Sequence, residues 1–110
     1  MNKTTYLGEL EHMILLAVLR LRDDAYGKSI RDELETQIGR KVTRAAAYIT
    51  LERLATKGYL TTRMGDPTAG RAGKPKRYYE LTEAGEYALR ESGQALRRLW
   101  AGHDAFLEET

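Results

Sequence analysis

The sequence predicts a mainly helical domain that carries one small β-hairpin. Apolar residues recur at helical spacing in three segments before residue 58 and again in the last quarter of the chain. Between them, two short segments flank a loop rich in glycine and proline, which is the pattern of a hairpin. The 110 residues suit a single domain, and their 42% hydrophobic content is typical of a globular protein rather than a disordered one.

The first predicted helix runs from about Leu7 to Leu21 and is apolar over most of its circumference. Such a helix is buried on several sides, so we expect it to contact both the domain core and a second subunit. Asp23 and Asp24 are expected to end this helix and to cap the next one. The candidates for the subunit contact are Leu15, Leu16 and Leu19.

Two further helices are predicted before the hairpin. The second runs from about Tyr26 to Gln37, places Ile30, Leu34 and Ile38 on one face, and stops at Gly39. The third begins after Thr43, a suitable N-cap residue, and closes at Gly58. Its inward stripe consists of Ala47, Leu51, Leu54 and Ala55. Its outward or sideways positions hold Arg44, Ala45, Tyr48, Ile49 and Glu52.

The hairpin is predicted from two strands, Tyr59–Met64 with Leu60 inward and Arg77–Leu81, joined by the turn-rich loop Gly65–Pro75. Successive strand residues point to opposite faces. One tyrosine of the pair at positions 78 and 79 is therefore expected in the core and the other outside.

A long C-terminal helix is predicted from Thr82 to about Leu107, with Glu83 and Glu86 well placed near its positive N-terminal end. Residues at steps of three and four form a seam for another helix. Because two of the six seam residues are polar, we expect packing on a partner helix and on the N-terminal helix rather than a free coiled coil. The seam residues are Leu89, Ser92, Leu96, Leu99, His103 and Phe106.

Three helices followed by a two-stranded hairpin is the order of a winged helix, a helix-turn-helix variant whose recognition helix is here the third. The stretch from Arg40 to Arg77 holds ten basic and two acidic residues, hence +8, whereas the remainder holds eight basic and fourteen acidic residues, hence −6. Eight of those ten basic residues lie around the start of the recognition helix or in the hairpin. This distribution indicates a polyanion-binding surface, and we expect duplex DNA as the partner.

Four segments resemble the PadR-like family of winged-helix transcription regulators. They read LGELEHMILLAVL, AYGKSIRDELE, YITLERLATKGYL and GRAGKPKRYYELTEAGEYAL, and the match extends from Leu7 to about Trp100. Each segment is weak alone, but their order and spacing are specific. Where family members often carry Gly-Thr-Leu-Tyr-Pro, this chain carries Ala45, Ala46, Ala47, Tyr48 and Ile49. Tyr48 matches the pattern, whereas the proline is missing. The resemblance implies a homodimer held by the C-terminal helix, and repression that a small aromatic or toxic effector relieves.

The predicted DNA contacts come from the recognition helix and the wing. Arg44 stands in the first helical turn, which usually reaches base edges, although a solvated or capping role is the alternative. Tyr48 either bonds a phosphate or packs beside Ala47 and Leu51. The wing cations are expected at phosphates or in the minor groove of a pseudo-palindromic operator. The predicted DNA-binding residues are Thr43, Arg44, Ala45, Tyr48, Arg71, Lys74, Lys76 and Arg77.

The predicted dimer interface joins the first and last helices. Trp100, the single tryptophan, packs in this interface or, by the family resemblance, lines an effector cavity between subunits. We divide the chain into a winged-helix DNA-binding domain, residues 1–81, and a C-terminal dimerisation helix, residues 82–110, within one compact unit. The predicted interface residues are Leu15, Leu19, Leu89, Leu96, Leu99, Trp100 and Phe106.

Enzymatic and metal-dependent functions are not expected. Ser29 and Ser92 lie on different predicted helices without a base nearby, and the chain holds no cysteine and no phosphate-binding Gly-Lys-Ser/Thr loop. No third ligand accompanies His12 or His103, so neither a metal nor another cofactor is expected. The most apolar run, Met13–Leu19, is too short for a membrane span and follows acidic residues, so we expect a cytoplasmic protein without a signal peptide.

A winged helix can also act only as a protein–protein interaction module. That function predicts an apolar or acidic outer face on the third helix. Arg44 and the basic middle segment disfavour it, while the outward Ile49 keeps it as the alternative.

Overall fold

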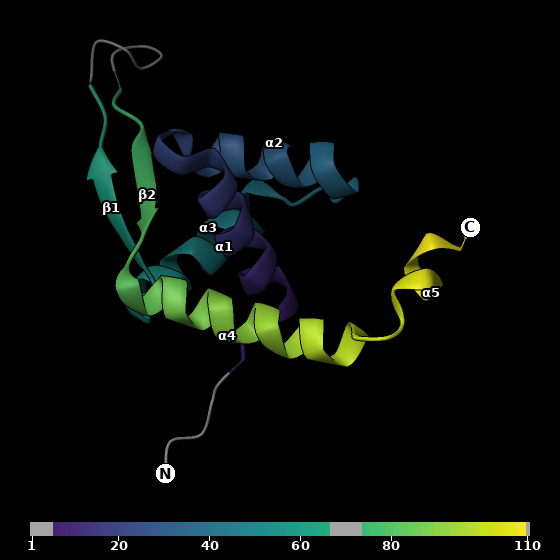
Figure 1. Ribbon diagram of the computed structural model, residues 1–110. Helices are drawn as coiled ribbons and strands as arrows, with labels where there is room; N and C mark the ends of the chain where they lie inside the picture. The colour runs from purple at the N-terminus through teal and green to yellow at the C-terminus, as the bar shows by residue number, and fades with distance from the viewer. Residues whose placement is uncertain (1–5, 67–73, 110) are drawn as a thin grey trace.

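Five α-helices, one 3₁₀ turn and a two-stranded sheet make up the computed structural model, which describes residues 6–66 and 74–109 (Figure 1). The predicted wing residue Arg71, with the rest of loop residues 67–73, lies outside the described residues. Three helices followed by a hairpin and a long helix confirm the predicted fold class. The elements are α1 (Glu9–Leu21), the 3₁₀ turn η1 (Arg22–Asp24), α2 (Gly27–Ile38), α3 (Arg44–Thr56), β1 (Leu60–Met64), β2 (Arg77–Leu81), α4 (Glu83–Trp100) and α5 (Asp104–Glu108).

The central helix of the domain is α1, which contacts α2, α3, α4 and β2. Its inner residues meet apolar side chains from the other elements in one core cluster, which includes Ile14, Leu15, Val18, Ile30, Leu51, Leu54 and Tyr79. The sequence predicted that Leu15 contacts a second subunit, but the structure places this residue in the core of its own chain. Leu15 is fully buried within its own chain, because α1 is covered on several sides by its own domain. Of the large apolar residues of α1, Leu16 and Leu19 are the exposed ones.

The start of α3 is capped as predicted, since Thr43 Oγ1 accepts a hydrogen bond of 3.0 Å from the Ala46 N–H. The start of α2 differs from the prediction. Asp23 and Asp24 form η1, one turn too early to cap, and Ser29 Oγ instead accepts a bond from the Tyr26 N–H. At the other end of α2, Gly39 adopts a left-handed conformation, which few other residues tolerate.

Ile38 was predicted on the same helix face as Ile30 and Leu34, but unlike those two residues it is exposed. It is the last residue of α2 and lies beyond the stretch that packs on the core.

The hairpin is antiparallel, with Leu60 opposite Leu81 and Met64 opposite Arg77. The Tyr79 N–H donates to the Ala25 carbonyl at 2.8 Å, which ties β2 to the segment between α1 and α2. Tyr79 is buried and its neighbour Tyr78 is only half-buried, as the alternation of strand side chains predicts. The wing therefore projects from a base that is attached to the helix-turn-helix (Figure 1).

The first turn of α4 packs closely against the turn that precedes β1. Thr82 Oγ1 accepts from the Gly85 N–H at 3.0 Å and donates to the Gly58 carbonyl at 2.6 Å. A Cβ atom at Gly85 would overlap the carbonyl oxygen of Tyr59, so only glycine allows this approach of α4 to the turn before β1.

The long C-terminal helix ends at Trp100 rather than at about Leu107. Gly102 takes a positive φ of 82°, and the chain continues into the short α5, which projects from the body of the domain (Figure 1). His103 and Phe106 therefore do not continue the predicted seam of α4. No helix in the described residues is long and apolar enough to cross a membrane.

Candidate nucleic-acid interface

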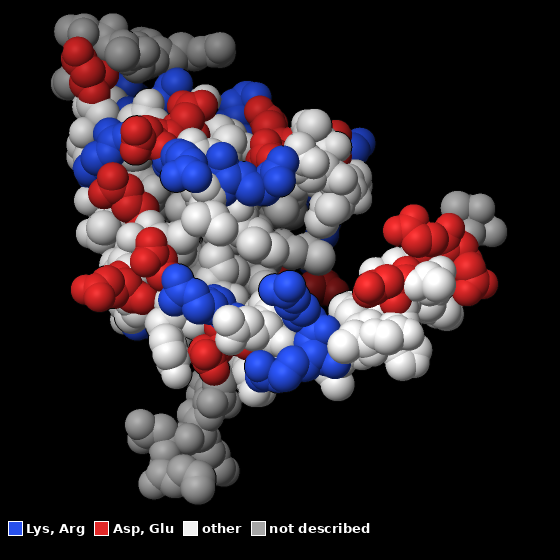
Figure 2. All heavy atoms as spheres, viewed as in Figure 1, with Lys and Arg blue, Asp and Glu red and all other residues white. Residues whose placement is uncertain are grey.

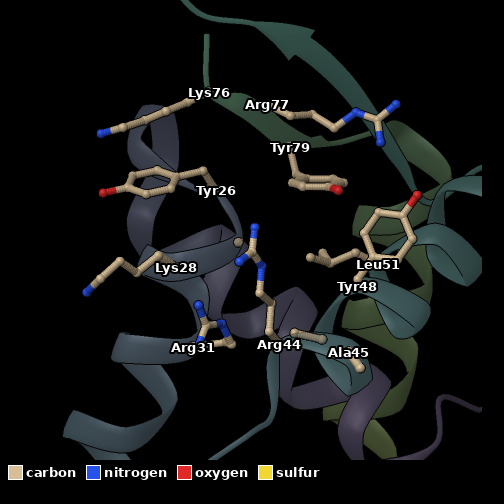
Figure 3. Close-up of a pocket in the computed structure, with 12 residues that line it drawn as sticks. Tyr26, Lys28, Arg31, Arg44, Ala45, Tyr48, Leu51, Lys76, Arg77 and Tyr79 are labelled. Atoms are coloured by element: carbon tan, nitrogen blue, oxygen red, sulfur yellow. The ribbon is translucent and has the colours of Figure 1, made fainter. Parts of the chain in front are cut away.

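A groove of about 910 Å³ opens where α2, α3 and β2 meet (Figure 3). Three elements contribute cationic side chains to it, and no carboxylate is among the described residues that line it. Tyrosine rings and the apolar side chains of α3 complete the walls. The lining residues are Tyr26, Gly27, Lys28, Arg31, Arg44, Ala45, Ala47, Tyr48, Leu51, Lys76, Arg77 and Tyr79.

The charges in this groove are only partly neutralised. Within the part of the chain that the structure describes, Arg31, Arg44 and Lys76 form no ion pair. The exposed Lys28 pairs with Asp32 at 2.8 Å, and Arg77 with Glu52 at 3.2 Å. Exposed pairs of this kind contribute little stability, so a bound anion can replace them at low cost.

Five of the eight residues predicted to bind DNA line this one groove. Arg44 extends from the first turn of α3 into its middle, and Tyr48 lies one turn further along, with its ring toward Arg77 (Figure 3). Ala45 and Lys76 complete the set. The predicted contacts therefore converge from two elements that are more than twenty residues apart in sequence.

The other three predicted residues lie elsewhere. Thr43 is exposed and uses its hydroxyl to cap α3. Lys74 is exposed in the loop segment that precedes β2 and does not line the groove, while Arg71 lies outside the described residues.

Sequence reasoning missed two cations of the groove, Lys28 and Arg31 on α2. Their spacing of three residues places them on one helix face, and this was the available signal. The average charge of the segment hides that signal, because the same helix carries Asp32, Glu33 and Glu35. Only the crossing of α2 over α3 reveals that the basic face points toward the recognition helix.

Aromatic rings hold the base of the wing against α2. The Lys76 ammonium lies 4.3 Å from the centre of the Tyr26 ring. The Tyr26 and Tyr78 rings pack edge to face, with their centres 5.6 Å apart. On the far side, the Arg63 guanidinium lies 4.4 Å from the centre of the Tyr78 ring. This alternation of cations and rings fixes Lys76 at the mouth of the groove.

Two groups that line the groove have shifted pKa values. The Tyr79 phenol, followed by Glu52, raises the pKa of Arg77. Burial raises the pKa of Tyr79 above its usual 10.0 despite the nearby guanidinium. At neutral pH Arg77 is therefore charged and Tyr79 neutral.

The sequence model of the transcriptional regulator PadR-like family matches residues 15–91. The chain belongs to the PadR-like family. Because this is a family of transcription regulators, membership agrees with the expectation that the protein is not an enzyme. No curated protein sequence matches the chain.

Solved structures share the fold of this PadR-like chain. A PadR family transcription regulator from Clostridium difficile has a TM-score of 0.74 at 21% identity, with 91% of this chain and 99% of that protein covered. A PadR-like transcription factor from Bacteroides fragilis has a TM-score of 0.69 at 30% identity, covering 82% of each chain. Bacillus subtilis PadR, solved in complex with operator DNA, has a TM-score of 0.63 at 24% identity over 74% of this chain and 45% of that protein.

Away from the groove, α1, α4 and α5 of the PadR-like chain also expose apolar side chains. Leu99 on α4 is 77% exposed, and Leu19 on α1 is 45% exposed. The predicted interface residues Leu96, Trp100 and Phe106 are exposed as well. On the face seen in Figure 2, side chains of both signs intermingle over the body, and acidic side chains gather on the projecting α5.

Leu89 needs correction, because the structure buries it in the core of its own chain. It lies in the half of α4 that packs on the domain, whereas the predicted interface residues Leu96, Leu99 and Trp100, which are exposed, lie in the second half. Among the described residues, no group of three histidine or acidic side chains is placed to hold a metal ion.

Proposed function

We propose that this chain binds a pseudo-palindromic DNA operator as a homodimer and represses transcription there. The observation that carries this proposal is the groove. Arg44 in the first turn of the recognition helix, and Arg31 and Lys76 beside that helix, form no ion pair with any described residue. The N-terminal part of a recognition helix is the part that reaches base edges in the major groove. The fold shared with operator-bound Bacillus subtilis PadR supports this function.

The proposed contacts divide into two classes. Arg44, Ala45 and Tyr48 approach base edges from α3, with Thr43 near the backbone at the helix start. The cations around them neutralise phosphates and position the helix, since such contacts carry affinity without sequence information. These phosphate-binding residues are Lys28, Arg31, Arg71, Lys74, Lys76 and Arg77.

The proposed dimer buries the free apolar residues of α1, α4 and α5. A monomer would leave Leu19, Leu96, Leu99, Trp100 and Phe106 in water, and the burial of such large apolar side chains in an interface is favourable. In this division, residues 1–81 bind DNA and residues 82–110 hold the subunits together. Two-fold symmetry then presents two recognition helices to half-sites about 34 Å, or a multiple of that distance, apart.

A small aromatic effector is proposed to relieve repression in the cytoplasm. The Trp100 and Phe106 rings, with centres 6.3 Å apart, offer an aromatic surface at the proposed interface. A flat apolar ligand there would change the relative placement of the two subunits. Because Trp100 is the single tryptophan, its fluorescence reports such binding directly.

Titration of DNA from upstream of the protein's own gene tests the main proposal. We expect tighter binding to that duplex than to a scrambled duplex of equal length, and affinity that falls steeply with salt. Fluorescence anisotropy at several salt concentrations measures both. Equal affinity for the two duplexes would rule out a specific regulator of that promoter, and no binding to either would favour the protein-interaction alternative.

A further inference from the structure

The outermost ridge of the recognition helix is apolar in its first two turns. Ala45 and Ile49 are four residues apart, so they lie on one helix face, one turn from each other. This face points away from the core, because the buried stripe of α3 is formed by Ala47, Leu51 and Leu54 on the opposite side. Ile49 is 56% exposed, and Ala45 is exposed at the edge of the groove (Figure 3).

The polar residues of α3 stand beside this ridge rather than on it. Arg44 and Tyr48 face the groove toward the wing. Glu52, the next residue along the outward face, is bound by Arg77 at 3.2 Å. The part of α3 that protrudes furthest in its first two turns therefore offers methyl and methylene groups and no hydrogen-bonding side chain.

Among the groups that base pairs present in the major groove, the apolar one is the C5 methyl of thymine. We propose that Ala45 and Ile49 recognise thymine methyl groups, so that each half-site carries a thymine beneath this ridge. The inference rests on the proposed DNA-binding function and specifies which chemical group of the operator this helix recognises. Cationic side chains line the groove beside this ridge. These charges favour a polyanion such as DNA as the partner of the ridge over an apolar protein surface.

Replacement of thymine by deoxyuridine tests the inference, because it removes the methyl group and leaves the hydrogen-bonding groups of the base in place. The probe is a duplex selected by the protein from a randomised pool. We expect thymine at one or more symmetric positions, and a loss of affinity of about fourfold per methyl group removed, the factor for burying one such group. A symmetric pair of replacements then costs about fifteenfold.

Ile49→Ala provides the second arm of the test. The variant should bind the thymine duplex several-fold more weakly than the wild type and discriminate less between thymine and deoxyuridine. Ile38→Ala is the matched control, since Ile38 is 53% exposed and does not line the groove, and it should keep the full discrimination. Circular dichroism and unchanged salt-dependent binding to random DNA would verify that both variants fold.

The outcomes separate this inference from the function on which it rests. Absence of any salt-dependent binding to duplex DNA would overturn both. Sequence-selective binding that deoxyuridine leaves unchanged would overturn the inference alone. Discrimination that persists in full in Ile49→Ala would also overturn it, by assigning the thymine preference to DNA shape.

Discussion

At the scale of single residues, Glu11 is the charged residue that the described part of the structure buries. It lies near the start of α1, where its carboxylate accepts bonds from the Gly8 N–H at 3.1 Å and from Lys57 Nζ at 2.8 Å. Burial raises the pKa of this carboxyl, but Lys57, the Gly8 amide and Arg53 together outweigh burial and hold the pKa below 4.5. Glu11 therefore links the start of α1 to the end of α3 while ionised.

Glu11→Gln should lower the free energy of unfolding at pH 7 by about 1–3 kcal/mol, because a charge-assisted contact is lost at a buried site. A lowered folded-state pKa stabilises the protein above the unfolded value of 4.5, and this contribution is lost as the pH falls through the folded pKa. The difference between wild type and variant should therefore shrink toward pH 3. Urea unfolding at pH 7 and pH 3 measures it.

The matched control is Glu9→Gln, whose partner Arg40 lies 2.7 Å away but whose side chain is 74% exposed. That substitution should change stability by less than about 1 kcal/mol. Equal losses in the two variants, or a Glu11→Gln effect that is as large at pH 3, would contradict this account.

At the scale of elements, the wing and α2 form the two cationic sides of the groove. Replacing Lys74, Lys76 and Arg77 by alanine should weaken binding to all duplexes and reduce the slope of log affinity against log salt by about 0.9 per lost phosphate contact. Anisotropy titrations at a series of salt concentrations give the slope. An Arg97→Ala, Arg98→Ala variant, which removes exposed cations from α4, should leave it unchanged.

If the wing variant keeps the wild-type slope, the wing cations do not contact phosphates and the hairpin is not part of the DNA interface. An equal reduction of the slope in the wing variant and in the Arg97→Ala, Arg98→Ala variant would assign the salt dependence to net charge rather than to the groove.

Local sequence signals predicted most elements, and the failures occur where tertiary packing decides. Thr43 is recognisable as a cap because capping needs only its own helix. The end of α4 is different, because glycine inside a helix costs only about 1 kcal/mol, so Gly102 marks an end only where no packing supports continuation. The burial of Leu15 and Leu89 likewise depends on which neighbours cover them.

The groove illustrates the same division between local and tertiary information. Arg44 and Lys76 could be predicted, because their helix and hairpin are recognisable in the sequence. Lys28 and Arg31 could not, because their role depends on how α2 crosses the recognition helix.

At the scale of the whole molecule, the central question is the second subunit. Leu99→Asp should abolish both dimerisation and operator binding, because it places a charge within the proposed apolar interface. Sedimentation at micromolar concentration, followed by DNA titration of the same samples, measures both properties. Ile38→Asp introduces the same charge at an exposed apolar residue on α2 and should remain dimeric.

A wild-type chain that sediments as a monomer would contradict the proposed dimer. So would a monomeric Leu99→Asp variant that binds its operator with full affinity, since that result would uncouple assembly from recognition.

Because α4 contacts the Tyr59 carbonyl at Gly85, a small rotation of the helix at this point displaces its far end by a larger distance. From Gly85 to its end at Trp100, α4 extends about 22 Å, at 1.5 Å per residue. A rotation of about 10° at Gly85 would displace the far end of the helix by about 4 Å, which exceeds the 3.4 Å rise of one base pair. With the subunits joined near that end, the absence of one side chain at position 85, where α4 meets the Tyr59 carbonyl, would help to set how many base pairs separate the two half-sites.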